Sequence, residues 1–148
     1  VTGHDPAPLQ EVLQGREVNW IHNPKYQSGI STSINAGVTE LPDQLDGMVL
    51  CLGDMPGVSD RQINRLIDGF RPDAVRVACF GKRRGHPALF PRAWFEKLLA
   101  LTGDDLARCL FDHLASAVVE VPMANDAVLR DVDYEEDLMP TPVGMIAQ

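Results

Sequence analysis

A carboxylate at the end of an apolar run is the feature of this chain with the clearest chemical potential. Residues 47–52 are apolar, and Gly53, Asp54 and Pro56 follow within four positions. We expect 47–52 to be a buried strand, and α/β folds bind their ligands at the carboxyl edge of the sheet. An aspartate before a proline-containing turn also caps backbone groups and closes a strand, so Asp54 has a structural interpretation beside the metal-binding one.

A second acidic segment, 131–138, contains two aspartates followed by three further acids. Magnesium bound to phosphate needs few carboxylates, because its other oxygen ligands come from water and substrate. Asp54 together with Asp131 or Asp133 would complete such a site. The acids at 135–137 fall in the first turn of an expected short helix, where the helix dipole favours negative charge without any function. We interpret these three as structural.

The loop 26–33, which follows Asn23 and Pro24, is rich in serine and glycine and opens an expected helix that ends near Leu41. Glycine permits close backbone approach, and hydroxyl groups at a helix N-terminus can donate to a ribose, a base or a phosphate. A serine-rich loop is also an ordinary helix cap. Both interpretations stay open on these residues alone.

A basic stretch, 81–85, joins two short β-rich runs at 74–80 and 86–90, which predicts a hairpin with a five-residue loop. Arginine forks pair well with phosphate oxygens. A basic hairpin tip on an acidic protein is, however, most often only solvated surface. His86, beside a proline, could donate to a substrate or bond to the backbone as a structural histidine.

These segments, in this order, resemble the MobA-like molybdenum-cofactor nucleotidyltransferases, and specifically the cytidylyltransferase branch. The resemblance rests on the Leu-Gly-Asp-x-Pro strand end at 52–56, the Asn-Pro loop at 23–37, the Gly-His-Pro segment within 84–90 and the acidic segment 131–138. The last departs from the family pattern, since Tyr134 and Glu135 stand where Thr-Pro is usual.

The resemblance implies which residues form the site. Asp54 and Asp133 would hold Mg2+ and serve catalysis, with Asp131 a weaker candidate. Other implied contacts are, for the nucleotide, Gly29, Ser31, Ser33 and Gly53, and for the acceptor substrate, Arg84, Gly85, His86 and Pro87.

The implied reaction is transfer of CMP from CTP to molybdopterin or its metal-bearing form, with release of pyrophosphate. A molybdoenzyme is a further expected partner. Two alternatives stay open: guanylyl transfer from GTP or transfer to a sugar phosphate, and a non-catalytic α/β module that binds a nucleotide or a protein partner.

The implied fold is α/β: a Rossmann-like nucleotidyltransferase three-layer sandwich with a mostly parallel, mixed sheet. We expect one domain over 1–138 and a flexible tail at 139–148.

The family's phosphate-binding loop is not in this sequence, and Val1 falls within an expected strand. We therefore expect that the N-terminal βα unit is missing and that the 148 residues alone are weakly active or inactive. Remaining expected elements are a helix at 8–14, a strand at 17–22, a capped helix from Ser59 and Gln62 to Phe70, helices at 91–101 and 102–114, and a strand at 118–121.

The bulk composition excludes some classes of partner. The net charge of −8 opposes binding to nucleic acid or to an anionic membrane, since both require a positive surface. Cys51, Cys79 and Cys109 form no Cys-x-x-Cys pair and lie in apolar runs, so we expect buried thiols in a reducing compartment and no zinc site. The sequence has no apolar run of membrane-spanning length and no signal-peptide pattern, which favours the cytoplasm.

Overall fold

The computed structural model describes residues 1–103 and 117–138. The chain divides into two compact units, each described here by itself. Unit 1 comprises Val1–Met48, Arg71–Val75 and Phe90–Val118, and unit 2 comprises Val49–Phe70, Arg76–Leu89 and Val119–Gln148. The predicted helix 102–114, with Cys109 and His113, and the predicted tail 139–148 lie outside the described residues.

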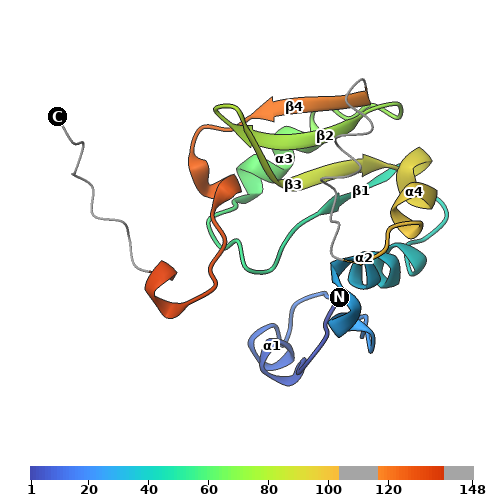
Figure 1. Ribbon diagram of the computed structural model, residues 1–148, viewed down its shortest axis with the longest axis vertical. Helices are drawn as coiled ribbons and strands as arrows, with labels where there is room; N and C mark the ends of the chain where they lie inside the picture. Colours follow the sequence, from blue (N-terminus) through green and yellow to red (C-terminus); the bar gives the residue numbers. More distant parts are fainter. Residues whose placement is uncertain (104–116, 139–148) are drawn as a thin grey trace. The chain divides into compact units, whose positions relative to one another are not determined.

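A four-stranded sheet, mostly in unit 2, has the strand order β1-β3-β2-β4. The strands are β1 (Gly47–Leu50), β2 (Val75–Phe80), β3 (Arg83–Pro91) and β4 (Val118–Pro122). Figure 1 labels all four. The helical elements are α1 (Ala7–Val12), η1 (Tyr26–Ser28), α2 (Ile30–Thr39), α3 (Asp60–Ile67), η2 (Arg92–Trp94), α4 (Phe95–Leu99), η4 (Asp126–Leu129) and η5 (Glu135–Leu138).

The predicted hairpin is confirmed, with a shorter loop than expected. β2 and β3 pair antiparallel, and the closing pair is Phe80 with Arg83. Only Gly81 and Lys82 connect them, and Gly81 has a φ of 61°, the left-handed conformation that a two-residue turn requires. Arg83 and Arg84 therefore belong to β3 and not to a loop.

The predicted strand at 17–22 is wrong. The backbone there makes one isolated parallel bridge, between Thr2 and His22. Thr2 N–H donates to the Ile21 carbonyl and Asn23 N–H donates to the Thr2 carbonyl, both at 2.8 Å. Residues 11–20 are exposed, so the alternation of apolar and polar residues has no neighbouring strand within the described chain to pair with. Local patterning cannot make a strand without such a partner.

Two further expectations about strands are corrected. β1 is half-buried along its length and not fully buried, because it lies at the edge of the sheet with β3 as its one neighbour in the described residues. Cys51, after β1, is exposed, whereas Cys79 in β2 is buried as predicted. Pro91 ends β3 instead of opening a helix: its ψ of 155° is extended, and the helical turn begins at Arg92.

The capping box that begins α3 is confirmed. Gln62 Oε1 accepts from the Ser59 backbone N–H at 2.8 Å, and the Ser59 side chain faces the first turn. The helix ends at Ile67, three residues earlier than expected. Arg76 of β2 caps this end, since its Nε donates to the Leu66 carbonyl at 2.8 Å. Both ends of α3 are thus fixed by side chains of unit 2.

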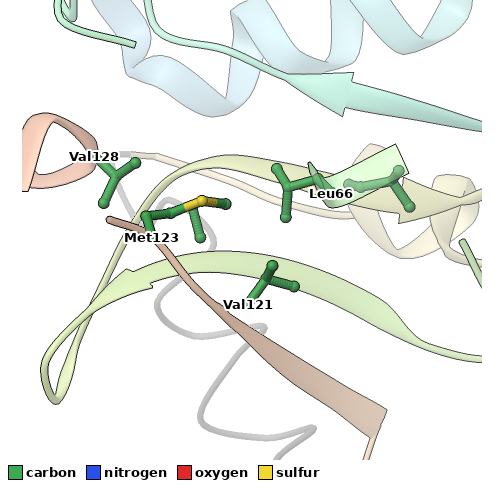
Figure 2. Packing of buried hydrophobic residues seen from close by; sticks show 6 residues of the cluster. Leu66, Val121, Met123 and Val128 are labelled. Carbon is green, nitrogen blue, oxygen red and sulfur yellow. The ribbon is translucent and has the colours of Figure 1, made fainter. Parts of the chain in front are cut away.

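A cluster of buried hydrophobic side chains forms the core of unit 2 (Figure 2). Its members come from α3, β2, β3, β4 and the segment through η4: Leu66, Ala78, Leu89, Val121, Met123 and Val128. Leu66 and Val128 are fully buried. This packing holds α3 and η4 against the strands that lead to the candidate site.

Unit 1 is built on helices. α2 packs against α4, and Ile34 and Leu98 are buried in these two helices. The short helix α1 is confirmed close to its expected position but buries none of its residues. Within the described residues, none of the helices has the length and apolar character needed to cross a membrane.

Candidate functional site

Asp54 lies on an exposed loop that directly follows β1. Gly53 and Asp54 are exposed, whereas Met55 is buried and anchors the loop in the protein. The Met55 carbonyl accepts from Val58 N–H at 3.1 Å, which closes the turn before α3. The fold therefore presents the Asp54 carboxylate to solvent at the carboxyl end of a strand, as the sequence predicts.

The acidic segment 131–133 lies directly beside Asp54. Val132 N–H donates to the Asp54 carbonyl at 2.8 Å, and both residues belong to unit 2. Asp131 and Asp133 flank this contact and are exposed, while Val132 is half-buried. The structure thus brings together two segments that are far apart in sequence. Their role in metal binding stays a prediction.

Asp137 has a structural contact, in agreement with its interpretation from the sequence. Its carboxylate accepts from Asp133 N–H at 3.1 Å and from Tyr134 N–H at 3.0 Å. These bonds close the turn that leads into η5. Asp137 therefore orders the backbone of Asp133 and leaves the Asp133 carboxylate exposed.

Two exposed carboxylates suit a cation that arrives with a phosphate. In residues 1–103 and 117–138, no group of three or more His, Cys, Asp or Glu side chains could hold a metal ion. A magnesium site made of protein alone would require more oxygen ligands than Asp54 and Asp133 provide. The donor set fits a cation whose remaining ligands are phosphate oxygens and water.

Gly85 lies in close contact with another segment of unit 2 and not on an open surface. A Cβ at this position would collide with the backbone carbonyl of Val128 and contact the Leu129 side chain. Arg84, the residue before it, forms an ion pair with Glu120 at 2.8 Å. Gly85 thus allows the segment through η4 to lie directly on β3, and a contact with substrate stays a prediction for both residues.

His86 lies near the end of β1 and near Asp54. Burial lowers the pKa of its imidazole below the usual 6.5, and a hydrogen bond to the Leu50 backbone and the Asp54 carboxylate partly oppose that shift. Its Nδ1 is buried without a hydrogen-bond partner in the described residues. Pro87 is fully buried, so its side chain belongs to the core.

In unit 1, Asn23 organises the loop that the sequence assigns to the nucleotide. Asn23 is buried; its Nδ2 donates to Thr32 Oγ1 at 2.8 Å and to Ser33 Oγ at 3.0 Å, and its Oδ1 accepts from Lys25 N–H at 2.9 Å. Gly29, with a φ of 106°, is the N-cap residue directly before α2. These bonds fix the loop against the first turn of the helix.

The two serines of that loop differ in access. Ser31 is only 1% exposed, and its N–H donates to the Gly103 carbonyl at 3.3 Å. Ser33 is half-buried, and its hydroxyl oxygen accepts from Asn23 Nδ2. Nucleotide contact stays a prediction for both, and access favours Ser33.

Residues 1–118 match the MobA-like NTP transferase domain. The chain belongs to this family. The matched span of the MobA-like domain includes the loop 23–33, Asp54 and His86, and it ends before Asp133. The prediction that Asp133 belongs to the site therefore rests on the contact of its segment with Asp54 and not on the family match.

Known relatives of the MobA-like chain agree with this assignment. The molybdenum cofactor cytidylyltransferase of Escherichia coli (strain K12) is 27% identical over an alignment of 143 residues, and the alignment covers 94% of this chain and 70% of that protein. The crystal structure of Rv0371c from Mycobacterium tuberculosis H37Rv has a TM-score of 0.74 at 26% identity, covering 91% of this chain and 70% of its own. A manganese complex of Rv0371c matches with a TM-score of 0.73 at 26% identity, covering 91% of this chain and 72% of its own.

These likenesses confirm the predicted α/β Rossmann-like nucleotidyltransferase fold with a mixed sheet. They also confirm that the chain is a nucleotidyltransferase by resemblance. Sequence reasoning missed Asn125, whose side chain joins α3 to η4. The signal was an asparagine before a short helical turn, a common capping pattern that by itself indicates no distant partner.

Proposed function

We propose that this MobA-like chain is a magnesium-dependent cytidylyltransferase that transfers CMP from CTP to a molybdopterin-type acceptor. The observation that carries the proposal is the hydrogen bond from Val132 N–H to the Asp54 carbonyl, which keeps two acidic segments together. The name of the Escherichia coli relative supports the cytidylyl and molybdopterin assignment. The manganese complex of Rv0371c supports a divalent cation.

In the proposed reaction, a phosphate oxygen of the acceptor attacks the α-phosphorus of CTP. A new phosphorus–oxygen bond forms, the bond from the α-phosphorus to the bridging oxygen breaks, and pyrophosphate leaves. The protein orients the reactants and stabilises developing charge. Asp54 and Asp133 would hold the cation, which neutralises charge on the phosphate oxygens.

The remaining assignments divide between the two reactants. Gly53, beside Asp54, is exposed, and a Cβ there would meet no atom within 4 Å, so the loop offers room for a nucleotide phosphate. Gly29 and Ser33 would contact the nucleoside. For the acceptor, the half-buried His86 lies near Asp54, and Arg84 offers a guanidinium shared with Glu120.

A second candidate is a nucleotide-binding module without transfer activity. It would use the same proposed nucleotide contacts, Gly29 and Ser33 among them, and would not require the metal site at Asp54 and Asp133. Both candidates require nucleotide binding, so only a transfer assay separates them.

Manganese binding tests the proposed metal site directly. We expect Asp54→Asn and Asp133→Asn each to weaken Mn2+ binding by about tenfold or more, because each removes a ligating charge. The matched control is Glu135→Gln, which removes one exposed acid from the same segment outside the site and should bind Mn2+ like the wild type. Electron paramagnetic resonance of free Mn2+ gives the affinities, and equal binding by Asp54→Asn and wild type would contradict the proposal.

Transfer is measured next, with labelled CTP and molybdopterin. Formation of labelled cytidylyl product, lost in Asp54→Asn, supports the cytidylyltransferase. Nucleotide binding without product favours the non-catalytic module. Product from GTP in place of CTP would assign the activity to guanylyl transfer instead.

A further inference from the structure

The amide of Gln62 is held in one orientation by the start of its own helix. Its Oε1 accepts from the Ser59 backbone N–H at 2.8 Å and contacts the Ser59 hydroxyl at 3.1 Å. Gln62 is buried, and this pairing fixes which end of the amide is the oxygen. The Nε2 group therefore points away from the cap and needs an acceptor elsewhere.

That acceptor is Asn125, in the segment that leads to the acidic residues. Gln62 Nε2 donates to Asn125 Oδ1 at 3.0 Å. The same oxygen accepts from Ala127 N–H at 3.2 Å and so caps η4. One side-chain oxygen thus joins the first turn of α3 to the first turn of η4.

The segment from Asn125 to Val132 contacts other segments of unit 2 at several further points. A Cβ on Gly57 would lie 3.1 Å from the Ala127 Cβ, so these backbones are in close contact. Val128 is fully buried, and its carbonyl lies against Gly85. Val132 N–H then donates to the Asp54 carbonyl at 2.8 Å. All these residues belong to unit 2.

We propose that Asn125 and Gln62 are positioning residues that hold the segment carrying Asp133 beside Asp54. Neither side chain carries a charge or acts on substrate. Their hydrogen bond fixes the position of Asn125, the first residue of the segment. The hydrogen bond from Val132 N–H to the Asp54 carbonyl depends on that position. The consequence for metal binding rests on the proposed function, whereas the placement of the segment does not.

Three variants separate this role from general stability. Asn125→Ser keeps a side-chain oxygen that can cap η4 but is too short to reach Gln62. Asn125→Asp keeps side-chain oxygens that can accept from both Gln62 Nε2 and Ala127 N–H, so it should retain the hydrogen bond to Gln62. Arg76→Met is the control, because it removes the cap at the opposite end of α3 and leaves the Asn125 bond in place.

The first readout is amide hydrogen exchange without metal. We expect the Val132 amide to exchange at least about tenfold faster in Asn125→Ser than in wild type, because the hydrogen bond to Asp54 opens more often. Asn125→Asp should return the rate to that of wild type, and Arg76→Met should not change it beyond any effect common to the strand amides. A Val132 rate in Asn125→Ser equal to that of the control would overturn the inference.

The second readout is Mn2+ affinity. If Asn125→Ser exposes the Val132 amide and also weakens Mn2+ binding, both the placement and the metal site are supported. If the amide is exposed while Mn2+ binding is unchanged, or if wild type binds no Mn2+, the placement stands and the proposed metal site fails. Weakened Mn2+ binding with a protected amide would overturn the positioning role.

Discussion

Replacing Gly85 by alanine should destabilise unit 2 although the change adds only one methyl group. The new Cβ would lie far inside the van der Waals contact distance from the Val128 carbonyl oxygen and against Leu129. That oxygen belongs to the backbone of a fully buried residue, so it cannot rotate away as a flexible side chain could. The segment through η4 must then move off β3.

The expected cost follows from overpacking a buried contact, which is about 1–3 kcal/mol. For a chain of this length, each kcal/mol lowers the melting temperature by about 2–4 °C. We therefore expect Gly85→Ala to lower the melting temperature by roughly 2–12 °C. Thermal and urea unfolding followed by far-ultraviolet circular dichroism measure both quantities.

Gly53→Ala is the matched control, since a Cβ at Gly53 meets no atom within 4 Å and its φ is not in the left-handed region. Its stability should lie within about 0.5 kcal/mol of wild type. Equal stability of the two variants would refute the reasoning that Gly85 is required for close packing. Reduced nucleotide binding by a fully stable Gly53→Ala would in addition support the proposed role of Gly53.

Two further predictions concern the core and the buried histidine. Leu66→Ala should lower the free energy of unfolding by about 2–5 kcal/mol, because it opens a cavity in the hydrophobic cluster. The control Leu99→Ala, at an exposed site, should lower it by less than about 1 kcal/mol. Urea unfolding measures both values. The pKa of His86 is lowered on folding, so the unfolded chain binds the proton first as the pH falls. Stability from this group is complete above about pH 6.5 and declines below it, by at most about 1.4 kcal/mol per pH unit. His86→Gln should flatten this decline, and an unchanged slope would show that other groups cause it.

Features that depend on a few neighbouring residues follow from the sequence. The capping box of Ser59 and Gln62 and the last strand, β4, lie where their patterns predict. The β2–β3 hairpin does too, apart from the length of its turn. In each case the hydrogen bonds or the alternation that define the element involve residues close together in the chain.

Features that need a distant partner are the ones that sequence reasoning misplaced. The alternating run 17–22 forms only one bridge because no described strand pairs with the rest of it. Pro91 has a fixed φ that suits an extended residue as well as a first helical turn. Arg92 N–H donates to the Asp46 carbonyl at 2.8 Å, and that neighbour keeps the stretch extended.

For the candidate site, residue types and their order along the chain suffice to predict a carboxylate at Asp54 shortly after a strand and a second acidic segment around Asp133. Which of these groups lie together, and which are only structural, depends on tertiary contacts. The tertiary structure joins Val132 to Asp54, ties Asn125 to Gln62, and presses Val128 onto Gly85. Spacing along the chain cannot specify these contacts, because each pairs backbone or amide groups from segments that meet only when the hydrophobic cluster of unit 2 is assembled.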